Sequence, residues 1–204
     1  MYKKPVIVFE GIEASGKSFH ITNVSKYLKK RKIKHITLRE PGGSVNSEKI
    51  RKLILSKKSK FNKDTDLLLY LSARSENLEF LNRYYKKRII LIDRFTDSTI
   101  AYQHYGMGVK LDIIESINKY LLKDFKVNFT FLNVVDKKNM KKRLKKRVNL
   151  NRYDKFKEDF YKKVQNGFLK IAKKKVNRYQ IIDSNLSINT NKKIIIEKIN
   201  KLIK

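Results

Sequence analysis

The feature that most constrains this chain is an apolar run, residues 5–9, that leads through a glycine-rich loop into a helical pattern. In a strand–loop–helix of this kind, backbone N–H groups and the helix N-terminus converge on phosphate oxygens. The lysine of such a loop reaches the terminal phosphates, and the next hydroxyl binds Mg²⁺. A glycine turn with a solvated lysine would need neither flanking element. We therefore predict that a nucleotide binds at Gly11, Ile12, Glu13, Ala14, Ser15, Gly16, Lys17 and Ser18.

Length and composition limit the rest of the molecule. A chain of 204 residues is long enough for one domain with a large core. The chain has no cysteine, which excludes disulfides and thiolate sites, and its three histidines are too scattered for a zinc site. No apolar run resembles a signal peptide or a membrane span. We expect a cytoplasmic protein that does not enter a membrane, with Mg²⁺ arriving on its nucleotide.

The formal charge of +31 is the most unusual compositional feature. A basic surface attracts nucleic acid, because polyphosphate chains are strongly negative. The lysines here are spread along every helical stretch, however, and do not form one stripe. Such a distribution is typical of a coding bias, and it attracts nucleotides as well as other polyanions. We therefore expect no dedicated nucleic-acid binding.

Strand-like and helical patterns alternate along the chain. Apolar runs typical of strands lie at Pro5–Phe9, His35–Leu38, Arg88–Ile92, Phe129–Val135 and Tyr179–Ile182. Amphipathic stretches lie at Ser18–Lys29, Ser47–Leu55, Thr65–Tyr85, Ser98–His104, Asp112–Leu121, Lys137–Lys146, Lys155–Lys174 and Asn191–Ile203. This alternation predicts one α/β domain over residues 1–204, a three-layer α/β/α structure of P-loop NTPase type with a five-stranded parallel sheet. Ligands are then expected at the carboxyl ends of the strands.

Two further segments leave predicted strands with charged residues. The run that begins at Arg88 ends in Asp93-Arg94, where an acid can hold Mg²⁺ and an arginine can bind phosphate. A surface ion pair at a strand end is the alternative. The second segment, Arg39-Glu40-Pro41, leaves its strand through a turn that can aim both charged side chains over the sheet edge, and its X–Pro bond is a candidate for the cis form. Taken alone, the segment could be an ordinary turn.

Four segments together resemble the bacterial thymidylate kinase family in their order and spacing. They are Glu10–Ser18, Arg39–Ser44, Ala73-Arg74 and Asp93–Gln103, within a similarity that runs from about Val6 to Ala172. The glycine loop alone indicates only a nucleotide-binding protein, whereas the last segment joined to the Arg-Glu-Pro-Gly-Gly turn is specific to this family. The resemblance implies transfer of the γ-phosphoryl group of MgATP to dTMP, giving dTDP and ADP in dTTP biosynthesis.

The resemblance also implies roles for residues around the phosphates. Lys17 matches the lysine on the transferring phosphate, and Glu13 matches an acidic residue near the 3′-hydroxyl of the deoxyribose. Arg39 and Arg94 match arginines that hold the dTMP phosphate, while Arg51 aligns with an arginine on the thymine side. The Mg²⁺ region is expected at Ser18 and Asp93.

Tyr70 and Arg74 lie four residues apart in a helical pattern, so they share a face and could offer a ring and a set of donors to a base. A core tyrosine beside a solvated arginine is the alternative. The family usually has phenylalanine where Tyr70 stands, so its hydroxyl needs another partner. Tyr102 aligns with a tyrosine that crowds the 2′ position of the sugar. The dTMP-binding positions implied are Glu13, Arg39, Glu40, Pro41, Arg51, Tyr70, Arg74, Arg94, Ser98, Thr99, Tyr102 and Gln103.

A basic segment at about 143–154 is interpreted as a lid over ATP. Arg147 and Arg152 flank Val-Asn-Leu-Asn, a polar break between two helical patterns, although a charge run is more often a solvated helix face. Residues 12–15 contain no arginine, and family members with this feature place one in the lid. We expect Arg147 first and Arg152 second to contact the transferring group. The family's usual Asp-Arg-x-Glu is Asn151-Arg-Tyr-Asp154 here, which leaves the anchoring of the lid open.

These assignments predict catalysis by alignment and charge, because a phosphate acceptor is already anionic and needs no general base. The catalytic candidates are Lys17, Arg94, Arg147, Arg152 and Glu13. The resemblance also implies a homodimer, with Thr65–Tyr85 and Ser98–Leu121 as candidate surfaces. Two alternatives remain at this stage: a kinase of the same fold for another small acceptor, and a nucleic-acid-stimulated ATPase.

Overall fold

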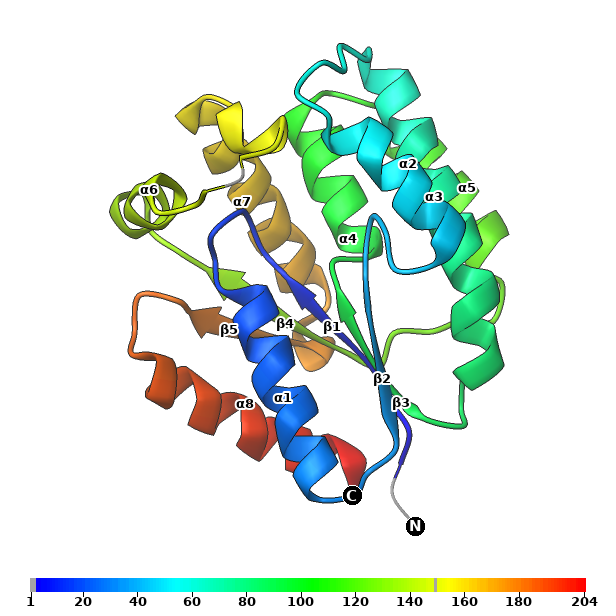
Figure 1. Ribbon diagram of the computed structural model, residues 1–204, viewed down its shortest axis with the longest axis vertical. Helices are drawn as coiled ribbons and strands as arrows, with labels where there is room; N and C mark the ends of the chain where they lie inside the picture. Colours follow the sequence, from blue (N-terminus) through cyan, green and yellow to red (C-terminus); the bar gives the residue numbers. More distant parts are fainter. Residues whose placement is uncertain (1–2, 149) are drawn as a thin grey trace.

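The computed structural model describes residues 3–148 and 150–204, and its centre is a sheet of five parallel strands (Figure 1). The residues of β1, mostly branched and aromatic, are buried on both faces of the strand, as is usual for a parallel sheet covered by helices. The register places Phe9 of β1 beside Asp93 of β3 and Phe131 of β4. The order β2-β3-β1-β4-β5 is formed by β1 (Val6–Glu10), β2 (His35–Arg39), β3 (Ile89–Asp93), β4 (Phe129–Val134) and β5 (Tyr179–Asp183). The predicted five-stranded parallel sheet is confirmed.

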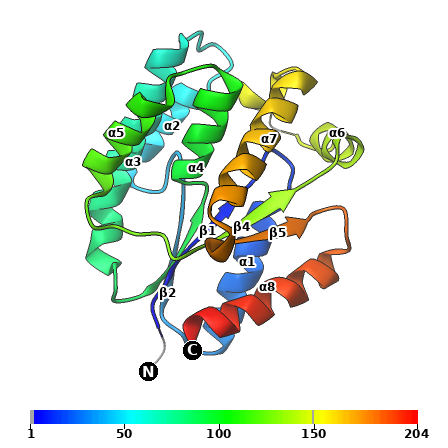
Figure 2. The same ribbon diagram turned by 180° about the vertical axis from the view of Figure 1, so that it is seen from behind.

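Helices cover both faces of this sheet (Figures 1 and 2). One face packs against α1 (Lys17–Lys30) and α8 (Ile188–Ile203), which bury Leu28 and Ile199 against the strands. The other face packs against α3 (Lys63–Tyr84), α4 (Thr96–Thr99) and α7 (Glu158–Lys174). The remaining helices are α2 (Val45–Leu55) and α5 (Leu111–Leu122), which pack on α3, and α6 (Lys137–Lys145), which follows β4. The predicted three-layer α/β/α architecture is confirmed.

Several helices begin or end away from their predicted limits. Ser44 caps α2 and Ser187 caps α8, so both helices start earlier than the apolar periodicity indicated. The predicted helix 98–104 begins at Thr96 as α4 and continues as a π-helical segment, Ile100–Gly106, a wider geometry that often accompanies functional sites. Short 3₁₀ turns lie at Tyr153–Lys155 and Val176–Arg178. No helix formed by the described residues has both the length and the apolar character needed to cross a membrane.

Candidate active site

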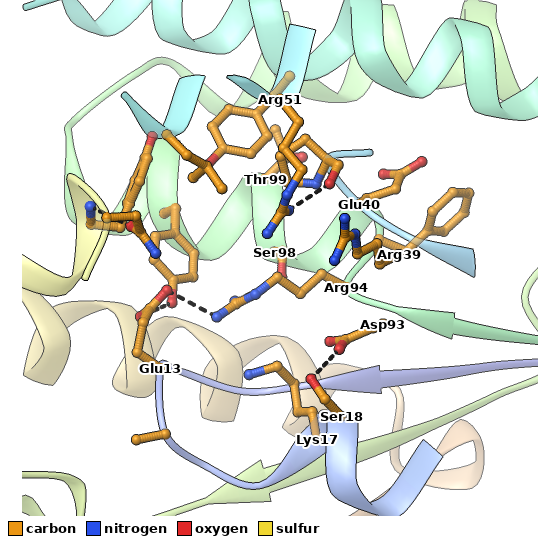
Figure 3. Close-up of a pocket in the computed structure, with 18 of the residues that line it drawn as sticks. Glu13, Lys17, Ser18, Arg39, Glu40, Arg51, Asp93, Arg94, Ser98 and Thr99 are labelled. Carbon is orange, nitrogen blue, oxygen red and sulfur yellow. Dashed lines mark hydrogen bonds and ion pairs between the residues drawn. The ribbon is translucent and has the colours of Figure 1, made fainter. Parts of the chain in front are cut away.

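The carboxyl ends of β1, β2 and β3 open into a cavity of about 510 Å³, a volume suited to small ligands. The wall is shared by the glycine loop, the turn after β2, helix α3, the segment after β3 and the segment after α6. Figure 3 shows how side chains from these separate parts of the sequence point into one space. The predicted residues that line the cavity are Glu13, Ala14, Gly16, Lys17, Ser18, Arg39, Glu40, Pro41, Arg51, Tyr70, Arg74, Asp93, Arg94, Ser98, Thr99, Tyr102, Gln103 and Arg147.

The loop between β1 and α1 has the conformation that its glycines allow. Gly11 and Gly16 have φ values of 138° and 88°, and a Cβ atom on Gly11 would lie 2.3 Å from the carbonyl oxygen of Asn133. Gly16 immediately precedes α1, so the helix N-terminus faces the cavity. The buried Ile12 and Ser15 complete the loop from behind.

Lys17 is folded against its own loop. Its ammonium group donates to the carbonyl oxygens of Gly11 and Ile12, at 2.9 and 2.7 Å, and to the Ser15 hydroxyl at 3.2 Å. Burial, together with the charge of Arg94, lowers the pKa of Lys17 to about 8. The site therefore holds a weakly solvated cation, which an anion can stabilise strongly.

Ser18 and Asp93 form the oxygen pair expected beside a nucleotide metal. The Ser18 hydroxyl donates to Asp93 at 2.6 Å, and the dashed line in Figure 3 marks this contact. Within residues 3–148 and 150–204 there is no cluster of three or more acidic, histidine or cysteine side chains that could hold a metal alone. Mg²⁺ is commonly bound through one or two protein oxygens, with phosphates and waters as its other ligands. The pair fits a nucleotide-borne Mg²⁺ better than a resident metal.

Three arginines from different elements approach one another above Lys17 (Figure 3). Arg39, at the end of β2, pairs with Glu48 at 3.0 Å, and Arg51 donates to the carbonyl oxygen of Pro41 at 2.6 Å. Burial and the neighbouring Arg39 lower the pKa of Arg51. Like charges gathered in this way are costly unless an anion balances them. The cluster is therefore suited to a phosphate group.

Arg94 is the third of these arginines and is already paired. It has a left-handed backbone conformation, with φ 66°, and donates to Glu13 at 2.9 Å. The second oxygen of Glu13 accepts the Tyr102 hydroxyl at 2.5 Å, and the Arg94 guanidinium lies over the Tyr102 ring. The glycine loop, the end of β3 and the π-helical segment thus meet at one ion pair.

Arg74 is buried rather than solvated, which corrects the alternative in which it faces water. Its Nε and Nη2 atoms donate to one oxygen of Glu40 at 2.9 and 2.8 Å, Nη2 donates to Thr99 at 2.9 Å, and Nη1 donates to Asn118 at 2.7 Å. Four of the five guanidinium N–H groups are therefore used within the protein. Arg74 holds the turn after β2 in place, and the Glu40–Pro41 bond in that turn is cis.

Gln103 has an unused donor in the cavity wall. Its side chain is 1% exposed, and its amide nitrogen has no hydrogen-bond partner among the described residues. A buried polar group without a partner is costly, so its usual explanation is a ligand or water that completes it. The ring of Tyr70, which also lines the cavity, meets the ring of Tyr153 edge to face at 6.0 Å.

The two candidate lid arginines are placed differently. Arg147 lines the cavity and donates to Asp154 at 2.6 Å. Arg152 does not line the cavity, as far as the described residues form its wall, and pairs with Asp66. Asp154 also accepts the backbone N–H of Asn151 at 2.8 Å, so aspartate anchors this segment in the position where the family usually has glutamate. The predicted lid includes Asn149, which lies outside the described residues.

Sequence reasoning missed two residues that shape the site. Glu10 is fully buried and accepts the backbone N–H groups of Phe95 and Ser98 and the Ser98 hydroxyl, and burial with nearby Asp97 raises its pKa to about 8. Its signal was a carboxylate at the end of an apolar run. Arg143 lines the cavity and donates to the carbonyl oxygens of Ala14 and Ser184, but in the sequence it is one cation in a long basic run.

Comparison with known proteins agrees with this geometry. A family model described as "Thymidylate kinase" matches residues 9–195. The chain is 38% identical to a thymidylate kinase of Sulfurihydrogenibium sp., over 95% of each chain, and 36% identical to one of Thermosipho africanus, over 90% of this chain and 91% of that one. The crystal structure of thymidylate kinase from Ehrlichia chaffeensis superposes with a TM-score of 0.78 at 29% identity, covering 97% of this chain and 98% of that one.

Proposed function

The chain belongs to the thymidylate kinase family, and from that premise we infer that its cavity transfers the γ-phosphoryl group of ATP to dTMP, giving dTDP and ADP. The observation that carries this conclusion is the convergence of the glycine loop, three arginines and the unpartnered Gln103 amide in one cavity. One part of the cavity suits a triphosphate and another suits a phosphate joined to a flat polar base.

ATP is assigned to the loop from Gly11 to Ser18. Lys17 is the group for the transferring phosphate, because a weakly solvated ammonium interacts strongly with an arriving anion. Ser18 and Asp93 would hold Mg²⁺, which would supply positive charge against the negative phosphates. The chain contributes positioning and fixed charges, and no general base is required.

The phosphate of dTMP is assigned to Arg39 and Arg94, with Arg51 beside them. Arginine presents donors in a planar fork that matches phosphate oxygens, and Figure 3 supports a common target for the three side chains. Glu13 would accept the 3′-hydroxyl of the sugar. Tyr102 donates to the same carboxylate, so a sugar bound to Glu13 would lie near its ring and a ribose 2′-hydroxyl would be crowded, which supports a preference for deoxyribose.

Thymine is assigned to the wall formed by α3 and the segment after β3. Gln103 has a free amide donor for an exocyclic oxygen, and Tyr70 offers a ring. Arg74 contributes mainly by holding Glu40 and Thr99, with one N–H left for a ligand. The Ser98 hydroxyl donates to Glu10, so it would contact the base only as a hydrogen-bond acceptor.

Arg147 is our candidate for the arginine that stabilises charge on the transferring phosphoryl group. It lines the cavity, and its half-exposed side chain pairs with Asp154 at 2.6 Å. Because the arginine side of this pair reaches solvent, Arg147 could exchange Asp154 for a phosphate oxygen. The segment 143–154 is therefore proposed as a lid on a single kinase domain.

A homodimer is proposed on the side formed by α3 and α5. Leu68 on α3 and Ile113 and Tyr120 on α5 are exposed apolar side chains on helices that pack together. Size-exclusion chromatography with light scattering tests this assignment, and a monomer at micromolar concentration would contradict it. We also propose a cytoplasmic location, where ATP and dTMP are available.

The decisive experiment measures ADP release from MgATP with dTMP, dUMP, dCMP, dGMP, AMP or single-stranded DNA offered separately. We expect the strongest release with dTMP and none that depends on DNA. Release with another monophosphate would support the same fold with a different acceptor, and release with DNA alone would contradict the assignment of a kinase. Omission of Mg²⁺ tests the metal.

A further inference from the structure

Asp66 is a buried carboxylate outside the cavity that the proposed reaction does not use. It lies in the first turn of α3, where it accepts a hydrogen bond from the Tyr153 hydroxyl at 2.8 Å and forms an ion pair with Arg152. Arg152 also lies over the rings of Phe61 and Tyr153, and its backbone N–H donates to Leu55 at the end of α2. We name Asp66, Arg152 and Tyr153 the Asp66 cluster.

The Asp66 cluster touches the nucleoside side of the cavity through Tyr153. This ring is buried, lines the cavity and contacts the rings of both Tyr70 and Tyr102 edge to face, at 6.0 and 5.9 Å. Its carbonyl oxygen accepts the Tyr161 hydroxyl of α7. Tyr153 is therefore held from several sides, and a shift of either cavity tyrosine is transmitted to it by direct contact.

The Asp66 cluster is also linked to the part of the cavity assigned to the phosphates, through Asp154, the residue after Tyr153. Asp154 follows Tyr153 directly in a 3₁₀ turn, and its carboxylate holds both Arg147 and the backbone of Asn151. Arg147 lines the cavity, as described above. An unbroken series of contacts thus runs from Tyr70 and Tyr102 to the lid arginine.

We propose that Asp66 is a positioning residue that couples the nucleoside side of the cavity to Arg147, by holding Arg152 and Tyr153 and thereby the turn that carries Asp154. This proposal rests on the proposed function, since it assigns a role in phosphoryl transfer. Arg152 then acts as an anchor of this turn and does not contact the transferring group. The charge pair is buried, so removing one partner leaves the other without compensation.

The first test compares Asp66→Asn with Asp64→Asn, a matched control. Both aspartates lie in the first turn of α3, but Asp64 is exposed. In Asp66→Asn we expect kcat to fall roughly 10- to 100-fold, because a small misplacement of Arg147 is costly, while KM for ATP changes little. In Asp64→Asn both constants should stay at the wild-type values. Equal kcat in the two variants would overturn the proposal.

A double-mutant cycle separates positioning from a general loss of structure. If Asp66 acts through Arg147, Asp66→Asn combined with Arg147→Ala should have the kcat of Arg147→Ala alone. If the fold-decreases in kcat of the two single variants multiply in the double variant, the proposal is overturned. A binding readout is the affinity for dTMP with and without a non-hydrolysable ATP analogue. We expect the ratio of the two affinities to move toward one in Asp66→Asn, and an unchanged ratio would count against coupling.

Tyr153→Phe provides a second variant if Asp66→Asn does not fold. It removes only the hydroxyl that donates to Asp66 and keeps the ring contacts with Tyr70 and Tyr102. We expect kcat to fall roughly three- to tenfold, in keeping with one buried hydrogen bond, and wild-type kcat would contradict the proposal. A wild-type protein that does not phosphorylate dTMP would instead overturn the proposed function, and the coupling with it.

Discussion

Arg94 donates to Glu13 at 2.9 Å, so the groups that we assign to the phosphate and to the 3′-hydroxyl of dTMP contact each other directly. They reach this position from the end of β3 and from the glycine loop, and the Tyr102 hydroxyl completes the pair. Because the ion pair is largely buried, neither charge can be removed without leaving its partner uncompensated. We therefore expect substitutions in this unit to affect acceptor binding more than ATP binding.

Arg94→Lys tests the unit without changing its charge. Lysine cannot present the planar fork that binds phosphate in two places, so kcat/KM for dTMP should fall roughly 100-fold while KM for ATP stays similar. Initial rates with each substrate varied will separate the two constants. Arg83→Lys on the exposed face of α3 is the matched control, and its kinetic constants should equal those of the wild-type enzyme. Equal losses for both substrates would contradict the assignment.

Gln103→Met tests the base contact. The substitution keeps most of the side-chain volume and removes the amide nitrogen that lacks a partner, so stability should be unchanged or slightly higher. KM for dTMP should rise about tenfold, since one hydrogen bond to a neutral group is lost. Thermal unfolding and steady-state kinetics measure the two effects. Lower stability together with an unchanged KM would show that Gln103 is a structural residue.

The pH dependence of ATP binding reports on Lys17. A lysine with its pKa lowered to about 8 loses its proton as the pH rises through 8, and the neutral amine attracts phosphate less. ATP affinity should therefore be constant below about pH 7 and fall by up to about tenfold per pH unit above pH 8, because binding then requires uptake of one proton. Calorimetry in buffers of different ionisation enthalpy measures that uptake.

Glu10 titrates in the same range and needs its own control. Its pKa is also about 8, so it loses a proton over the same interval as Lys17. Glu10→Gln removes that titration and should keep the fall in ATP affinity above pH 8. Lys17→Met should bind ATP weakly and without this dependence. A profile that becomes flat in Glu10→Gln would assign the effect to Glu10.

Arg147→Ala tests the lid arginine. We expect kcat to fall about 10³-fold, the magnitude found for arginines that stabilise a transferring phosphoryl group, with a smaller change in KM for ATP. Lys146→Ala is the neighbouring control, because that side chain is exposed and carries the same charge. A fall in kcat below tenfold in Arg147→Ala would remove the residue from the mechanism.

Local patterns predicted the elements well, because periodicity and caps act over a few residues. All five strands and the glycine loop were recognised, and so was the acidic strand end at Asp93. The predicted starts of α2 and α8 were too late in the sequence, since Ser44 and Ser187 cap helices whose first turns lack apolar periodicity. The π-helical geometry after Thr99 was also missed, because seven residues do not distinguish a π-helix from an α-helix by pattern.

The sequence by itself determined the glycine loop to which we assign the ATP phosphates, because such a loop is built from adjacent residues whose backbone would make the contacts. Only the tertiary structure decided which charged and polar side chains meet. Arg74 binds Glu40, Arg152 binds Asp66 and Glu10 binds Ser98, and each pair joins residues from separate elements. The physical reason is that a buried polar group must pair with a group close to it in the folded protein. The positions of charges along the chain do not give these distances. The clearest case is the separation of Arg147, which lines the cavity, from Arg152, which lies outside the described wall and pairs with Asp66.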